Sequence, residues 1–68
     1  METMTATEVI AKSAARDQII TVDAGDIDIE ALRTAATNWV ENGHVTEYWG
    51  RDEEGDTWRV HVLNSLLA

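Results

Sequence analysis

Hydrophobic residues near the start of the chain recur at intervals of three and four, which is helical spacing. Thr5 and Glu8 stand three residues apart, as the two members of a capping box do. These patterns predict a short helix over residues 5–16. Its apolar positions are Ala6, Val9, Ile10 and Ala14. Because this face is small, we expect the helix to pack on a sheet edge or on a second copy; the alternative is a frayed arm.

The pattern then changes to that of a β-strand over residues 18–24. Ile19, Ile20 and Val22 are β-branched, which suits a pleated sheet. Since side chains alternate between the two faces of a strand, Ile20 and Val22 share one face, and we expect both in the core. Gly25 ends the strand.

Helical spacing returns in the middle of the chain and predicts the main helix, over residues 28–42. Asp26 or Asp28 is expected to cap its start, and Gly43 suits the left-handed residue that follows its end. The apolar positions are Leu32, Ala35, Ala36, Trp39 and Val40. Trp39 would be the largest side chain of the core.

A β-hairpin is predicted next, with strands over residues 44–50 and 57–63. The turn over residues 51–56 contains Gly55, which is available for positive φ. Apolar and polar residues alternate in the second strand, so one face would be buried and the other exposed to solvent. The buried positions would be Trp58, Val60 and Val62, and the solvent-exposed positions would be Arg59 and His61.

These elements predict an α+β fold in one domain over residues 1–68, with its core in residues 18–63. A three-stranded sheet in the order β-α-β-β would carry the main helix on one face, beside the short N-terminal helix. Residues 64–68 would form a tail, in which Leu66 and Leu67 pack on the core or on a partner.

Two acidic runs lie in the predicted connections. Because a helix returns the chain between them, the strands over residues 18–24 and 44–50 are expected to run parallel. Both runs would then lie at one end of the domain and form an acidic pole, with Arg51 as the local base. The runs are Asp23, Asp26, Asp28 and Glu30, and then Asp52, Glu53, Glu54 and Asp56.

Charge is the strongest signal in the composition, since 13 acidic and 5 basic residues give a net charge of −8 in 68 residues. Such a chain is repelled by nucleic acids and anionic membranes, and its partners would be basic surfaces. The solubility of a small domain, or an acid-rich proteome, explains the same charge. The absence of cysteine excludes disulfides and favours an intracellular location. Neither a membrane span nor a signal peptide is recognisable.

No catalytic arrangement is readable, so the sequence predicts a protein that is not an enzyme and needs no cofactor. Ser13 and Ser65 have no nucleophile setting, and a domain this small has little room for a cleft. Neither acidic run has the pattern of a calcium loop, so no metal site is predicted. Three interpretations of the acidic pole remain: cation binding, helix caps with a solvated turn, or a face that imitates nucleic-acid phosphates toward a basic groove.

Tyr48 and Trp49 are adjacent in a strand, so one of them must point away from the helix side. Cross-strand packing with Trp58 is one interpretation of these aromatic residues. The other is an exposed anchor for a partner or a dimer. We therefore include Tyr48 and Trp49 with the pole acids as candidate partner-binding residues. The net charge argues against stacking on single-stranded nucleic acid.

The segment over residues 21–36 resembles the strand-to-helix junction of small phage anti-CRISPR proteins that inhibit type I systems. The resemblance is carried by Thr21-Val22-Asp23-Ala24, Asp26-Ile27, Ala31, Ala35 and Ala36. Those proteins are of similar length, often acidic and often α+β; they bind the DNA-surveillance complex, and several block its DNA-binding groove. The resemblance implies a location in the host cytoplasm, with the pole acids facing lysines and arginines that normally hold DNA.

The leading hypothesis is a non-enzymatic inhibitor that occupies a basic nucleic-acid-binding surface, most concretely on a type I CRISPR surveillance complex. A second hypothesis is a small structural or dimerising domain that uses Tyr48, Trp49 and the Leu66–Leu67 pair. A third is a cation-binding domain. Salt-sensitive binding, a dimer that ignores salt, and heat released on adding calcium or magnesium would distinguish the three.

Overall fold

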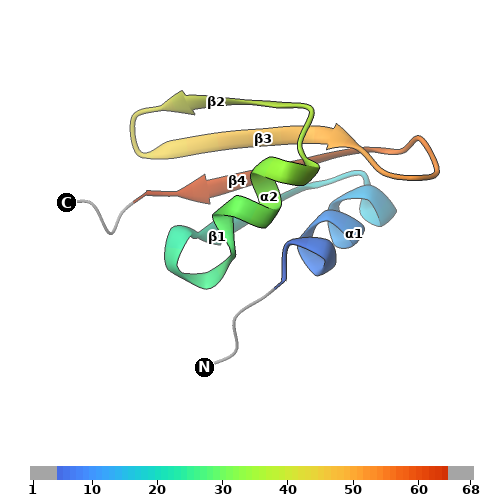
Figure 1. Cartoon of the computed structure of the whole chain (residues 1–68), viewed down its shortest axis with the longest axis horizontal. Helices are drawn as coiled ribbons and strands as arrows, with labels where there is room; N and C mark the ends of the chain where they lie inside the picture. Colours follow the sequence, from blue (N-terminus) through green and yellow to red (C-terminus); the bar gives the residue numbers. More distant parts are fainter. Residues whose placement is uncertain (1–4, 65–68) are drawn as a thin grey trace.

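The computed structural model describes residues 5–64, which form an α+β fold and confirm the expected class (Figure 1). The sheet has four strands, one more than expected. Leu66 and Leu67 lie outside the described residues. The elements in chain order are α1 (Ala6–Arg16), β1 (Ile19–Asp23), the 3₁₀ turn η1 (Ala24–Asp26), α2 (Ile29–Ala35), β2 (Asn38–Asn42), β3 (Val45–Arg51) and β4 (Thr57–Leu63).

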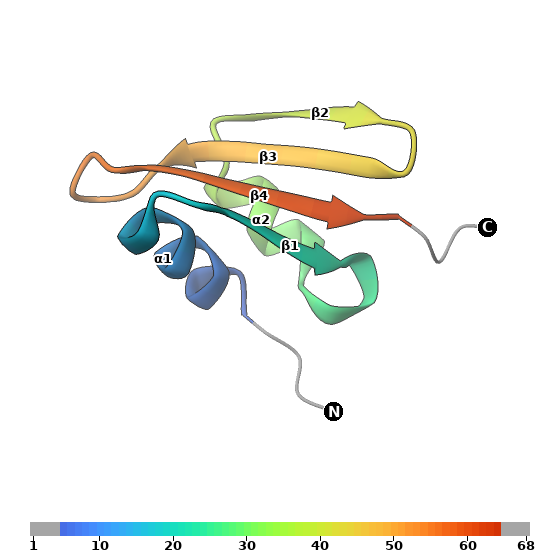
Figure 2. The ribbon, with the colours of Figure 1, turned by 180° about the vertical axis from the view of Figure 1, so that it is seen from behind.

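The strand order across the sheet is β1-β4-β3-β2. β1 pairs with β4 in parallel, while the β4–β3 and β3–β2 pairs are antiparallel. Both helices lie on the same face of the sheet, and the view from behind shows the strands in front (Figures 1 and 2). The opposite face is left uncovered by the described residues.

α1 begins with the predicted cap. The hydroxyl of Thr5 accepts a hydrogen bond from the backbone N–H of Glu8 at 3.1 Å, and the helix follows at Ala6. The helix buries Ala6 and Val9 and lies across the sheet face, mainly over the central strand β4. The expectation that it would pack on the sheet edge is therefore wrong.

Ser13 connects α1 to the sheet. Its side chain is only 1% exposed, and its hydroxyl lies 2.7 Å from the carbonyl oxygen of Gln18 and 3.0 Å from that of Arg59. The same oxygen accepts a hydrogen bond from the backbone N–H of Arg59 at 2.8 Å. Since Arg59 pairs with Ile19 at the start of β1, the serine satisfies backbone groups where the β1–β4 ladder begins.

The core lies between the helices and the covered face of the sheet. Its largest fully buried side chains are Trp58 and Tyr48, followed by Leu32 from α2. Burial alternates along β4 as expected, with Trp58, Val60 and Val62 inside. On β1, Val22 is buried and Ile20 is half-buried, so both contribute to the core as expected.

The predicted helix over residues 28–42 is wrong beyond Ala35. Residues 38–42 form β2, which pairs with β3 through a tight turn at Gly43 and His44. Gly43 has φ +65°, so its positive φ serves a two-residue hairpin loop instead of a helix end. Trp39 is therefore a half-buried strand residue, with its ring 5.9 Å from that of Tyr48 and below the Arg33 guanidinium.

The extra strand reverses the direction of the chain. β3 is antiparallel to β4 and β4 is parallel to β1, so β1 and β3 run in opposite directions. The sequence predicted these two strands to be parallel, because it placed a single helix between them. This correction determines where the acidic residues lie.

Candidate partner-binding groove

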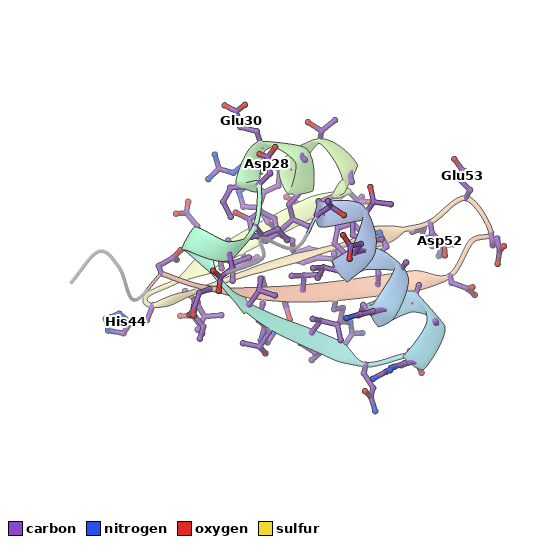
Figure 3. All side chains as sticks on the ribbon, turned by 90° about the horizontal axis from the view of Figure 1, so that it is seen from below. Asp28, Glu30, His44, Asp52 and Glu53 are labelled. Carbon is purple, nitrogen blue, oxygen red and sulfur yellow. The ribbon has the colours of Figure 1, made fainter. Side chains whose placement is uncertain are left out.

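The two acidic runs lie toward opposite ends of the sheet, so the expected single acidic pole is wrong (Figure 3). β1 ends beside Leu63, at the end of β4, whereas the turn between β3 and β4 lies beside the start of β1. We call Asp23, Asp26, Asp28 and Glu30 the acidic junction, and Asp52, Glu53, Glu54 and Asp56 the acidic turn.

One member of the acidic junction is a helix cap. Asp28 immediately precedes α2, and its carboxylate accepts hydrogen bonds from the backbone N–H groups of Glu30 at 3.1 Å and Ala31 at 3.3 Å. A carboxylate at this position satisfies free N–H groups of the first turn and meets the positive end of the helix dipole. Asp28 is thus a structural residue of the junction.

One member of the acidic turn is likewise structural. The Asp52 carboxylate accepts hydrogen bonds from the backbone N–H groups of Glu54 at 3.0 Å and Asp56 at 2.8 Å. Gly55 has φ +88°, as its place in the turn led us to expect. Within residues 5–64 the carboxylates of Glu53, Glu54 and Asp56 make no hydrogen bond or ion pair. Three negative charges of the turn are therefore available to a partner.

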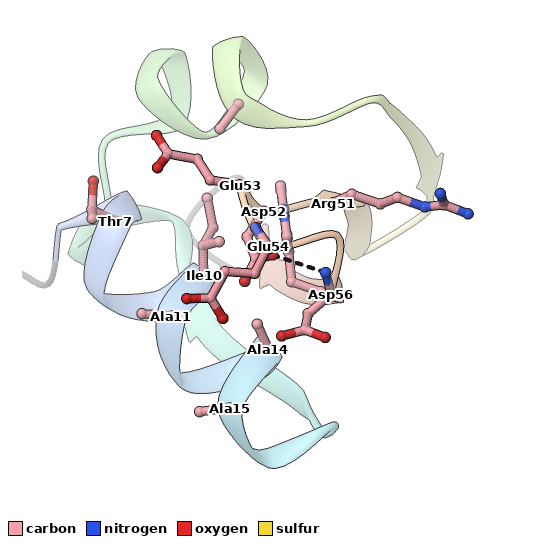
Figure 4. A pocket seen from close by; sticks show the side chains of 12 residues that line it. Thr7, Ile10, Ala11, Ala14, Ala15, Arg51, Asp52, Glu53, Glu54 and Asp56 are labelled. Atoms are coloured by element: carbon pink, nitrogen blue, oxygen red, sulfur yellow. Dashed lines mark hydrogen bonds between the residues drawn. The ribbon is translucent and has the colours of Figure 1, made fainter.

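The acidic turn forms one wall of an open groove, and α1 forms the other (Figure 4). The groove has a volume of about 540 Å³. β4 contributes Trp58, which is the most buried of the lining residues at 1% exposed, and α2 contributes Ala35. The α1 wall consists of Thr7, Ile10, Ala11, Ala14 and Ala15. The groove thus combines an apolar wall with an acidic one.

Charge within the groove is not neutralised by the neighbouring base. Glu53 and Glu54 extend over the groove toward α1, while the Arg51 side chain extends away from it (Figure 4). Glu53, Glu54 and Asp56 are exposed and adjacent, so their negative charges add at the mouth of the groove. The groove is therefore suited to positively charged groups.

The two aromatic candidates have different environments. Tyr48 is 2% exposed and belongs to the core, so the expectation that it contacts a partner is wrong. Trp49 is half-buried on the uncovered face of the sheet, beside Arg59 on β4 and Asn38 on β2. Ile19 and Val40 on the same face are 46% and 52% exposed. Trp49 remains available to a partner or to a second copy.

The histidines do not assemble a catalytic site with these groups. His61 Nε2 lies 2.8 Å from the Glu47 carboxylate on the uncovered face, and His44 lies in the β2–β3 turn (Figure 3). In the part of the chain from Thr5 to Asn64, no group of three or more histidine, cysteine or acidic side chains could hold a metal ion. Of the described helices, none is long and apolar enough to cross a membrane.

The acids of the groove were predictable from the sequence, but its α1 wall was not. The signal was a second helical stripe of small and apolar residues beside the buried one, and Ala11 and Ala15 in it are exposed. Comparisons with protein-family models, curated proteins and solved structures found no match for this chain. A proposal for the function of this chain therefore rests on the chemistry of its own residues.

Proposed function

We propose that this chain is a non-enzymatic binding protein that inhibits its partner by occupying a basic surface. The observation that carries the proposal is the acidic turn, whose three unpaired carboxylates, among the described residues, stand along an open groove. These three charges also attract a basic partner before contact, over distances up to about the Debye length.

In its most concrete form, the basic surface is the nucleic-acid-binding groove of a type I CRISPR surveillance complex. Support comes from the resemblance of residues 21–36 to anti-CRISPR proteins, together with the short length and the acidity of the chain. The protein would then act in the cytoplasm of the host, and the acidic turn would take the place of DNA phosphates against lysine and arginine side chains.

The fold offers a matched pair of variants to test the proposal. Each acidic group has one structural carboxylate, Asp28 or Asp52, which both variants keep. The turn variant changes Glu53→Gln, Glu54→Gln and Asp56→Asn. The junction variant changes Asp23→Asn, Asp26→Asn and Glu30→Gln, and alters the net charge by the same amount at the other end of the sheet.

The assay measures displacement of fluorescent target DNA from a purified type I surveillance complex. Exposed ion pairs contribute about 0.2–1 kcal/mol each, so the turn variant should compete roughly 3- to 150-fold less well than the wild type. The junction variant should compete almost as well as the wild type. Failure of the wild-type protein to displace DNA would refute the CRISPR form of the proposal.

The general form of the proposal needs a separate measurement. Tagged wild-type and variant proteins are compared in pull-downs from host lysate at about 0.05 M and about 0.5 M salt, between which screening increases strongly. We expect partners that carry basic surfaces, elute at high salt and are lost with the turn variant. Equal recovery with the wild type and the turn variant would count against a role of the turn.

A second candidate function is self-association through the uncovered sheet face. The observation that favours it is the presence of Trp49, Ile19 and Val40 on a face that no described helix covers. Sedimentation at micromolar concentration would show a dimer that persists in high salt and is weakened by Trp49→Ser. A monomer under these conditions would exclude this function.

A further inference from the structure

The α1 wall of the groove lies beside the core face of the helix, and its members Ile10 and Ala14 also pack against the core. The core face contributes Ala6, Val9 and Ser13, all buried. The groove stripe is displaced around the helix and recurs at i, i+3, i+4, i+7 and i+8. Ile10 and Ala14 are half-buried, and Ala11 and Ala15 are exposed. Small side chains at these positions allow another chain to approach the helix closely.

The opposite wall provides negative charge directed toward this surface. The Glu53 and Glu54 side chains reach toward α1, so a ligand between the walls would contact hydrocarbon and carboxylate at once (Figure 4). Lysine and arginine side chains have this composition, with a hydrocarbon stem and a cationic end. A simple metal ion would leave the apolar wall unused, and an anion would be repelled by the turn.

The volume of the groove indicates more than one side chain. It is an open groove of about 540 Å³, which one side chain would not fill. Its length follows two turns of α1, from Thr7 to Ala15. A segment of another protein, with several side chains in contact, matches these dimensions better than a single amine.

We infer that this groove binds a protein segment that carries arginine or lysine beside apolar residues. The inference rests on the proposed function and specifies the chemistry of the partner at the acidic turn. The apolar residues of the segment lie on Ile10, Ala11 and Ala14, and its cations meet Glu53 and Glu54. Charge complementarity selects this occupant over a second copy of this acidic chain.

The test uses a short fluorescein-labelled helical peptide of leucine, alanine and arginine as the probe. One control peptide replaces its arginines by glutamine, and another replaces its leucines by serine. Fluorescence anisotropy in about 0.1 M salt should show binding of the probe, with both control peptides at least about tenfold weaker. Binding of the serine peptide as tight as that of the probe would overturn the inference, because the apolar wall would then contribute nothing.

The groove-filling variant Ala11→Phe keeps every charge and occupies the apolar wall. Because Ala11 is exposed, the variant should fold, and Ala15→Phe provides a second filled groove if it does not. We expect Ala11→Phe to weaken the probe at least about tenfold, as the turn variant does. NMR shifts on adding the probe to wild-type protein should centre on Ile10, Ala11 and Ala14, and shifts elsewhere would refute the inference.

The two proposals fail in different ways. If Ala11→Phe binds the probe like the wild type while the turn variant loses it, the acids act without the groove; the further inference is then wrong and the proposed function stands. If the turn variant also binds like the wild type, both are wrong.

Discussion

The Ser13→Ala substitution tests how α1 is held on the sheet and, with it, how the apolar wall of the groove is positioned. Ser13 is 1% exposed, and its hydroxyl accepts a hydrogen bond from the Arg59 N–H at 2.8 Å. Its single O–H donates to the nearer carbonyl oxygen, that of Gln18 at 2.7 Å, with the carbonyl oxygen of Arg59 at 3.0 Å. Alanine removes these bonds and leaves the Arg59 N–H at the β1–β4 boundary without a partner.

The expected loss follows from two contributions. A buried donor left unsatisfied costs about 1–3 kcal/mol, and the lost bond from the hydroxyl to a carbonyl costs about 1 kcal/mol more. Alanine recovers about 0.5 kcal/mol through its better helix propensity. The free energy of unfolding should therefore fall by about 1.5–3.5 kcal/mol, a large part of the roughly 3–10 kcal/mol expected for a chain of this length.

The measurement is urea unfolding followed by tryptophan fluorescence. Thr34→Ala is the matched control, because Thr34 also has a hydroxyl that bonds a carbonyl, that of Glu30 at 2.9 Å, but lies exposed on α2. We expect Thr34→Ala to change stability by less than about 0.5 kcal/mol. A loss below about 0.5 kcal/mol for Ser13→Ala would refute this account of α1 docking.

Three further substitutions test the turns and the close packing of the sheet by urea unfolding. In Gly50→Ala the new Cβ would lie 3.0 Å from Trp58 Cζ2 and 3.1 Å from the backbone nitrogen of Thr37. We therefore expect the free energy of unfolding to fall by about 1–3 kcal/mol. A urea midpoint equal to that of the wild type would contradict this packing. In Gly43→Ala the new Cβ has no neighbouring atom within 4 Å, but the residue must keep a φ of +65°. The free energy of unfolding should therefore fall by about 1–2 kcal/mol, and by less in Gly43→Asn, because asparagine adopts positive φ more readily. Asp52→Ala should lower the free energy of unfolding by about 1–2 kcal/mol and speed hydrogen exchange of the Glu54 and Asp56 amides, which Asp52 caps. Exchange at the wild-type rate would show that the turn does not need this cap.

The sequence predicted correctly those elements whose local pattern is compatible with only one type of secondary structure. Thr5 and Glu8 fixed the start of α1 through a cap that needs only residues three apart. The alternation around Val60 fixed the inner face of β4, because period two has no helical alternative. The acids of the groove were identified by charge alone.

Residues 36–42 were misassigned because their signals fit two structures equally well. Trp39 and Val40 continue the helical spacing of Leu32 and Ala35, yet aromatic and β-branched residues also favour strands. Asn42-Gly43 suits both a helix end and a hairpin turn. The choice is made by contacts distant in sequence, above all the pairing of Trp39 with Tyr48 on β3. The α1 wall of the groove was missed because it becomes a wall only when the acidic turn folds beside it.

The separation of the two acidic groups changes what electrostatics can do for this chain. β4 has seven residues, so the two ends of the sheet lie about 20 Å apart. The Debye length is about 10 Å at 0.1 M salt, so charges at one end are largely screened from a partner bound at the other. A single pole of eight carboxylates would act as one strong charge, whereas here each end acts nearly alone. If the proposed function is right, binding at the groove depends on Glu53, Glu54 and Asp56 together with the apolar wall. The salt dependence of that binding should then correspond to about three charges.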